Sequence, residues 1–204
     1  NEGRGGFKVA LAKGLGETIF YSFNRTHKDP VLRKIFADAR FSKAMSVAIN
    51  REEAVDLVFL GQAEPQQAMP MEPATVSFIE PKKHLLQYTE FDPAAAKAML
   101  AEMGLKDSDG DGFVERPDGK PLSLVMASTP TTRDREIDEI WQRNLKAIGV
   151  RVDFVKQKWP DLLKMGKAGQ LQFWRVGWIN AYAEGDAFAQ LLYGRNIGQT
   201  NYAR

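Results

Sequence analysis

The second half of this chain alternates short apolar runs with amphipathic stretches, and this rhythm constrains the fold more than any other feature. The predicted strands are apolar runs with polar or glycine borders, and they cover 122–127, 150–155 and 171–178. The predicted helices carry apolar residues at helical spacing, and they cover 137–148, 160–167 and 186–193. Strands separated by helices need right-handed crossover connections, which give parallel pairing. The expected fold class is therefore α/β, with a mixed, largely parallel sheet and flanking helices.

The first half adds two predicted strands, a loop and a helix. The strands are expected at residues 7–12 and 17–24, after a glycine-rich start. Four prolines within residues 62–81 exclude regular structure there, so this stretch is expected to be an extended crossing loop. A helix is expected to begin at Asp92-Pro93, a cap followed by a proline in the first turn, and to end at Gly104.

Residues 40–61 predict two helices joined by a cap. The buried face of the first helix follows i, i+3, i+4 spacing and consists of Phe41, Ala44, Met45, Ala48 and Ile49. Asn50 is expected to cap the second helix by accepting from the backbone N–H of Glu53, whose carboxylate reaches back in a capping box. The apolar stripe of the second helix runs to Gly61 and consists of Val55, Val58 and Phe59.

The residues of this segment are similar to those of one protein family. Those that carry the similarity here are Asp38, Arg40, Ala44, Ser46 and residues 48–52. Further matching motifs are Phe91-Asp92-Pro93, Met103-Gly104, residues 109–112, Trp141, residues 144–146, residues 148–150, Trp159 and Gly177-Trp178. Together they resemble the family 5 extracellular solute-binding proteins, the oligopeptide- and dipeptide-binding receptors of bacterial ABC importers.

The resemblance implies one lobe of a two-lobed periplasmic-binding-protein fold of type II, cluster C, with the ligand between the lobes. Residues 1–204 would then be a single domain, the second ligand-binding lobe, without the N-terminal lobe and the closing C-terminal segment. The implied function is capture of oligopeptides or a related small solute and delivery to the membrane subunits of an ABC permease. The implied location is the periplasm or, with a membrane anchor, the outside of a bacterial cell, and no enzymatic activity is expected.

Charge and composition exclude several other classes of protein. The 28 basic and 26 acidic residues nearly cancel, so no nucleic acid or anionic membrane is expected as a partner. No apolar run approaches the roughly 20 residues that span a bilayer, so no direct membrane insertion is expected. The chain has no cysteine and therefore no disulfide or thiolate nucleophile. It is expected to be a monomer, and its start without methionine suggests a fragment.

The stretch 173–182 is the best candidate for a binding surface, because open α/β sheets bind ligands beyond the carboxyl ends of their strands. Arg175 can donate two hydrogen bonds to a carboxylate, and Trp178 can cover an apolar or peptide face. The resemblance implies an arginine and a tryptophan of the cleft at these two positions. The expected ligand-binding residues are Asn24, Arg175, Trp178, Asn180 and Tyr182. The alternative is that Trp174, Val176 and Trp178 form a buried strand face and that Arg175 pairs with a nearby acid.

Ala181 departs from the pattern that the resemblance implies. Many peptide binders of the family carry an aspartate at this position, where it holds the α-amino group of the ligand. A peptide with a free N-terminus would need another anchor here, such as Glu184 or Asp186. The solute therefore stays open between a peptide, an opine-like compound, a nickel complex and a sugar.

An acidic loop forms a second constellation. Its carboxylates fit the spacing of a calcium loop and are Asp107, Asp109, Asp111, Glu115 and Asp118. Five carboxylates in twelve residues repel one another unless a cation or solvent relieves them. Asp-Gly pairs also make turns without a metal, and the helix that leaves a calcium loop is missing. A structural calcium ion is thus one interpretation, and no other cofactor is expected.

Two rival functions remain at this point. The first is a calcium-stabilised structural or interaction module with no transport role, which would depend on the acidic loop. The second is an enzyme acting on small polar substrates, which would place a titratable pair in a pocket. His27 and His84 are the only histidines and show no spacing typical of a metal site or a triad, and no nucleophile elbow or phosphate-binding glycine loop is present.

Overall fold

A four-stranded mixed sheet forms the centre of the computed structural model, which describes residues 5–8, 10, 17–67, 85–179 and 195. Its strands are β1 (Glu17–Phe23), β2 (Ser123–Ser128), β3 (Arg151–Lys156) and β4 (Phe173–Ile179). The spatial order is β1-β4-β2-β3, with β2 parallel to both β3 and β4 and with β1 antiparallel to β4. The expected α/β class with a largely parallel sheet is confirmed.

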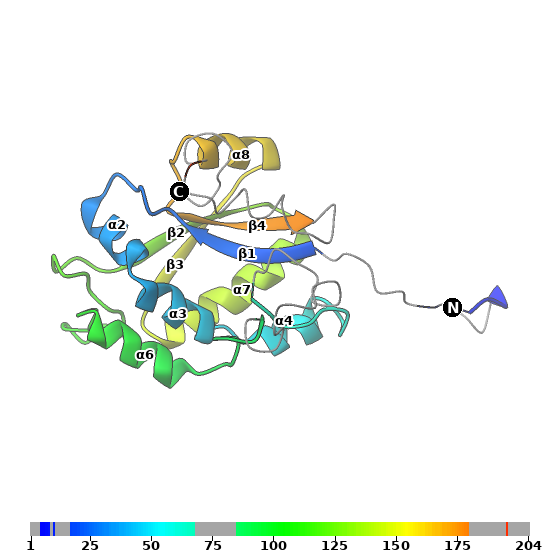
Figure 1. Ribbon diagram of the computed structural model, residues 1–204, viewed down its shortest axis with the longest axis horizontal. Helices are drawn as coiled ribbons and strands as arrows, with labels where there is room; N and C mark the ends of the chain where they lie inside the picture. Colours follow the sequence, from blue (N-terminus) through cyan, green and yellow to red (C-terminus); the bar gives the residue numbers. More distant parts are fainter. Residues whose placement is uncertain (1–4, 9, 11–16, 68–84, 180–194, 196–204) are drawn as a thin grey trace.

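Helices cover both faces of the sheet (Figure 1). They are α2 (Pro30–Ala37), α3 (Ala39–Val47), α4 (Arg51–Leu57), α6 (Pro93–Glu102), α7 (Thr132–Ala147) and α8 (Trp159–Lys167). In Figure 1, α8 lies on one face and α3, α4, α6 and α7 lie on the other. None of the described helices is long and apolar enough to cross a bilayer.

Two apolar clusters hold these layers together. The larger one lies between the sheet and α2, α3, α6 and α7, and its fully buried members include Phe36, Phe41, Met126 and Phe173. The smaller one lies under α8 and consists of Ala127, Leu162, Leu171 and Trp174. Neighbouring residues of β2 and β4 fall in different clusters because successive side chains of a strand point to opposite faces. All five apolar positions expected on the first helix of the 40–61 segment are buried.

Polar caps set where the helices begin. Asn50 Oδ1 accepts from the N–H of Glu53 at 3.0 Å, as expected for the cap of α4. The reciprocal half of the expected capping box is wrong. The backbone N–H of Asn50 donates instead to Asn144 Oδ1 of α7 at 2.8 Å, and the Glu53 carboxylate pairs with Arg143. Residues of α7 thus bind both groups that would have closed the capping box, and these contacts fix α4 against α7.

Several expectations differ from the structure or lie beyond it. Residues 7, 8 and 10 of the strand expected over 7–12 are described, and they lie outside any strand. Residues 62–67 have no regular structure, as expected for the start of the crossing loop. The rest of that loop from residue 68, and the helix expected over 186–193, lie outside the described residues.

Candidate ligand-binding site

The sheet changes from apolar to polar between two successive rows of side chains on the face that α7 covers. The apolar row belongs to the larger cluster and consists of Phe23, Phe173, Met126 and Phe154. The next row, two residues further toward the carboxyl ends of the parallel strands, consists of Tyr21, Arg175, Ser128 and Lys156, and we call it the polar row. Because β2 and β3 end at Ser128 and Lys156, the polar row lies where α/β sheets bind ligands.

Helix α7 places two carboxylates against the polar row. Asp134 and Asp138 lie four residues apart and therefore share one face of the helix. Arg175 Nη2 contacts Asp134 Oδ1, and Arg175 Nη1 lies 3.5 Å from Asp138 Oδ1. Lys156 Nζ contacts Asp138 Oδ2, which also accepts a hydrogen bond of 2.6 Å from Ser128 Oγ. Both cations of the polar row thus meet a carboxylate of α7.

These charged groups are largely sealed from solvent. The side chains of Arg175, Asp134 and Asp138 are 6%, 10% and 3% exposed, whereas that of Lys156 is 34% exposed. Arg175 Nη1 and Asp138 Oδ1 are both buried without a hydrogen-bond partner, although they face each other. Buried charge is costly unless it is both paired and hydrogen-bonded. The cluster is therefore matched in charge but incompletely matched in hydrogen bonds.

Tyr21 supplies the neutral end of the polar row. It is the cross-strand partner of Arg175, and its ring stacks on Trp141 with centroids 3.7 Å apart. Burial raises the pKa of Tyr21 above its ordinary value, and the guanidinium of Arg175 opposes that rise only in part. The phenol is therefore protonated at neutral pH and keeps a donor next to the arginine.

A cavity of about 830 Å³ adjoins the polar row at Tyr21. Its described lining is largely apolar and includes Ile19, Met45, Ile49, Ala54, Val55, Phe59, Ile137, Ile140 and Trp141. None of the described residues of α4 is buried, and two members of the expected stripe, Val55 and Phe59, line the cavity instead of the core. Ligand pockets of proteins typically measure about 300 to 1,000 Å³ and are mostly apolar, with few polar groups. The cavity has the size of such a pocket, and its wall also carries polar residues, among them Lys43, Glu64 and Gln67.

Arg51 is a largely buried cation of the cavity wall, and its hydrogen-bond donors are used by other groups of the protein. Its Nη1 donates to the carbonyl oxygens of Ser46 and Thr89 at 2.8 and 3.3 Å, and its Nη2 donates to Ser46 Oγ at 2.7 Å. Burial lowers the pKa of Arg51 from its ordinary value. These bonds tie α3 to the segment before α6, and they leave Arg51 in a structural role.

Of the residues expected to bind the ligand, the structure brings only some to the carboxyl ends of the parallel strands. Arg175 lies in the polar row, paired with acids as in the alternative interpretation of the sequence. Trp178 lies in β4, but its side chain is outside what the structure describes, as are Asn180, Ala181 and Tyr182. Contacts of these residues with a ligand stay predictions.

Asn24 lies at the opposite ends of the strands from the polar row. Its Nδ2 donates to the carbonyl oxygens of Gly169 and Leu171 at 3.0 and 2.8 Å, and its Oδ1 accepts from the N–H of Thr26. The structure separates Asn24 from the polar row because it sits at the carboxyl end of β1, which runs antiparallel to β4. Its amide joins the end of β1 to the turn before β4.

Sequence reasoning did not single out Asp134, Asp138, Lys156 or Tyr21. One signal was available, since two aspartates at i, i+4 spacing lie at the start of the helical segment that follows a predicted strand. Their partner Arg175 could not be assigned from that spacing, because it depends on the order of the strands in the sheet.

The acidic loop gathers four of its five carboxylates. Asp107, Asp109, Asp111 and Glu115 each offer an oxygen, and these oxygens lie within 4.8 Å of one another. The loop also uses these groups itself, because Asp107 accepts from the N–H groups of residues 110 and 112 at 2.7 and 2.9 Å. Calcium binding by these four carboxylates stays a prediction.

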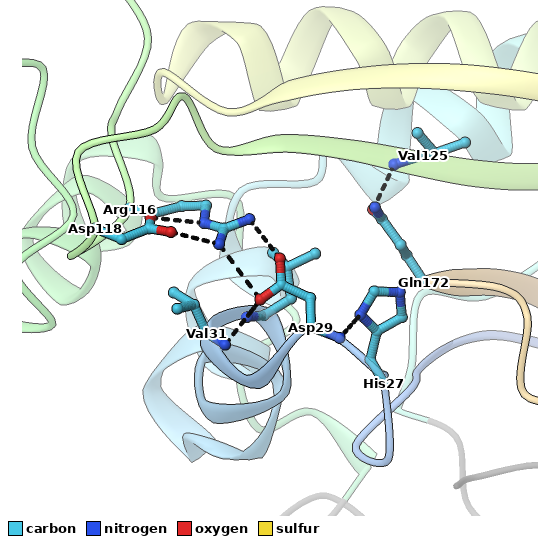
Figure 2. A network of polar contacts seen from close by, with 8 residues as sticks. His27, Asp29, Val31, Arg116, Asp118, Val125 and Gln172 are labelled. Carbon is cyan, nitrogen blue, oxygen red and sulfur yellow. Dashed lines mark hydrogen bonds and ion pairs between the residues drawn. The ribbon is translucent and has the colours of Figure 1, made fainter.

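Asp118 does not join this group and pairs with Arg116 instead, so a contact of Asp118 with calcium stays a prediction. Arg116 donates to both of its oxygens, at 3.0 Å from Nε and 2.8 Å from Nη2, and also reaches Asp29 (Figure 2). Desolvation alone would raise the pKa of Asp118, but the hydrogen bonds from Arg116 lower it below its ordinary value. The arginine two residues away thus takes the place that a cation was expected to fill.

Comparison with known proteins assigns the chain to a family. The model of the bacterial extracellular solute-binding proteins, family 5, middle part, matches residues 4–199. The chain belongs to this family. The oligopeptide-binding protein AppA of Bacillus subtilis is 32% identical over 132 residues, which cover 64% of this chain and 24% of that protein. The di/tripeptide-binding protein 2 of Pseudomonas aeruginosa is 28% identical, covering 75% of this chain and 26% of its own.

A solved structure shows the same fold. The oligopeptide-binding protein OppA superposes with a TM-score of 0.80 at 29% identity, over 92% of this chain and 29% of the other. The family resemblance drawn from the sequence is confirmed. The chain spans about a quarter of the length of the curated relatives that it matches.

Proposed function

We propose that this chain is a ligand-binding lobe of a bacterial extracytoplasmic receptor, which captures a peptide or related small solute and delivers it to the permease of an ABC importer. The observation that carries the proposal is the polar row, which lies at the carboxyl edge of the parallel strands beside a largely apolar cavity. Family membership and relatives named as peptide-binding proteins support it. The chain would be the second of two lobes, because it matches the middle part of the family model and about a quarter of each relative.

Closure of the two lobes on the solute would produce the state that the permease recognises. A solute that contacts both lobes stabilises the closed state by its difference in affinity for the closed and open states. The closed receptor, a monomer in the periplasm or anchored at the outer surface, then presents a recognisable shape to the permease. One lobe alone offers part of these contacts, so residues 1–204 by themselves should bind the solute at least about a hundredfold more weakly than the complete receptor.

The polar row is better suited to binding than to catalysis. Asp134 and Asp138 each pair with a cation and accept from a hydroxyl, Thr129 in the first case and Ser128 in the second. A general acid or base must instead exchange a proton with a substrate within hydrogen-bond reach. We therefore propose a receptor without enzymatic activity.

Native mass spectrometry of the complete receptor, purified without refolding, tests the proposal. A ladder of bound masses that fits short peptides is expected, and a single non-peptide mass would keep the receptor and change the class of solute. Isothermal titration calorimetry with the recovered solute then gives the affinity. A protein that carries no solute and binds no member of a peptide and oligosaccharide panel would refute the receptor function.

Two variants of α4 locate the site. Ala54 lines the cavity, whereas the side chain of Leu57 on the same helix is 64% exposed. Ala54→Trp should fill part of the cavity and weaken solute binding at least tenfold, and Leu57→Trp should leave the affinity within twofold. Equal affinities of the two variants would remove the cavity from the site.

A further inference from the structure

The positive charge of Arg175 is balanced by two carboxylates of the same chain, and this balance limits the charge that a solute can bring to Arg175. We propose that Asp134 and Asp138 are built-in counter-ions of Arg175, so that the receptor binds a solute that presents no carboxylate to this edge of the sheet. An uncharged oligosaccharide, or a peptide whose C-terminal carboxylate is blocked, meets that condition. The inference rests on the proposed function and narrows its substrate class.

The first support is the direction of the guanidinium. An arginine that recognises a ligand carboxylate presents two parallel N–H groups to it. Here Nη2 contacts Asp134 and Nη1 faces Asp138 at 3.5 Å. Both ends of the fork therefore point at acids of the same lobe, and only 6% of the side chain is exposed.

The second support is that the two acids are held in place. Asp134 Oδ2 accepts from Thr129 Oγ1, and Asp138 Oδ2 accepts from Ser128 Oγ and contacts Lys156 Nζ. Neither carboxylate can turn away without breaking a second buried contact. A ligand carboxylate brought to Arg175 would then lie beside two fixed negative charges, and juxtaposed like charges disfavour binding.

The third support is the local balance of charge. Arg175 and Lys156 contribute two positive charges, and Asp134 and Asp138 contribute two negative ones. Arg133 also lies near this group, with its Nε 4.0 Å from Asp134 Oδ1 and half of its side chain exposed. Arg175, Lys156 and Arg133 thus each have an acid of α7 as a neighbour, whereas Arg51, which lies near Tyr21, donates to Ser46 and Thr89.

Calorimetry on the complete receptor with matched solute pairs tests this inference. Each pair differs in one carboxylate: a tripeptide and its C-terminal amide, and a neutral oligosaccharide and its aldonic acid. We expect the neutral member of the binding pair to bind at least as tightly as the acid. Tenfold tighter binding of the acid would overturn the inference and leave the receptor function standing. Binding of no pair by a receptor that still carries a solute in native mass spectrometry would overturn the inference and leave the receptor function standing.

Asp134→Asn provides the second arm. It removes one counter-ion of Arg175 with little change in shape, so the ratio of acid to neutral affinity should rise at least fivefold. Asp153→Asn is the matched control, because it removes the same charge from an exposed position on β3, and its ratio should stay unchanged. An equal ratio in both variants would overturn the role of Asp134 as a counter-ion. The comparison of solute pairs in the unmodified receptor needs neither variant to fold.

Discussion

Two arginines, Arg116 and Arg175, are each held between two aspartates. Arg116 joins Asp29, the cap of α2, to Asp118 in the acidic loop (Figure 2), and Arg175 joins β4 to two aspartates of α7. Their side chains are similarly hidden, at 10% and 6% exposed. The two sites thus contain the same ionic groups in similar numbers.

The two sites differ in how completely they are hydrogen-bonded. Arg116 donates to all four carboxylate oxygens around it, at 2.8 to 3.3 Å, and its aspartates are 29% and 30% exposed. Around Arg175 one nitrogen and one oxygen lack a hydrogen bond, and the aspartates are 10% and 3% exposed. Buried polar groups are nearly always hydrogen-bonded in folded proteins, so the incomplete matching distinguishes the Arg175 site from the cross-link at Arg116.

The largest expected effect compares the two arginines directly. Arg175→Met leaves Asp134 and Asp138 buried with fewer partners and should lower the free energy of unfolding at pH 7 by about 3 kcal/mol. Arg116→Met leaves carboxylates that water can reach and should lose less than half as much. Urea denaturation of both variants measures the difference. An equal or larger loss of unfolding free energy in Arg116→Met would contradict the difference proposed between the two sites.

The dependence of stability on pH sharpens the comparison. Desolvation raises the pKa of Asp29, but backbone N–H groups of α2 and the Arg116 guanidinium outweigh it, so the pKa is lowered, as it is for Asp118. Carboxyl groups with a lowered pKa stabilise the fold above their unfolded value near pH 4, and this stabilisation is lost as the pH falls further. The stability difference between the wild type and Arg116→Met should therefore shrink between pH 4 and pH 2.5. A difference that stays constant over this range would contradict the role of these two pairs.

His27 gives the smallest expected effect. It is buried, and its Nδ1 accepts from the N–H of Asp29 at 3.2 Å (Figure 2). Burial lowers the pKa of His27, so its stabilising neutral form is fully present above pH 6.5 and is lost as the pH falls through its lower folded value. The wild type should lose about 0.5 kcal/mol more than His27→Gln between pH 7 and pH 5, as measured by urea denaturation. An equal loss in both proteins would exclude His27 as the titrating group.

Local patterns of the sequence predicted most of the described fold. Apolar periodicity located the three parallel strands, and the caps at Asn50 and Asp92 marked the starts of two helices. The polar row could not be predicted in this way, because it brings together residues from all four strands. Its composition depends on register and strand order, which packing decides and local sequence does not.

Competing partners explain why two side chains depart from what their spacing predicts. Glu53 has the spacing of a capping box, but Arg143 of α7 pairs with its carboxylate. Asp118 has the spacing of a calcium ligand, but Arg116 binds it from two residues away. A spacing rule describes what a side chain can reach within its own segment, and in both cases a cation was a stronger partner.

The pairing of β1 with β4 has a consequence for the synthesis of the protein. These are the first and the last described strands, coloured blue and orange in Figure 1, and Phe23 pairs with Phe173. About 150 residues must leave the ribosome between the two, which takes roughly 8 to 30 seconds at about 5 to 20 residues per second. During that time the aromatic face of β1 has no partner strand. The nascent chain therefore passes through a long interval in which β1 is open both to chaperone binding and to aggregation.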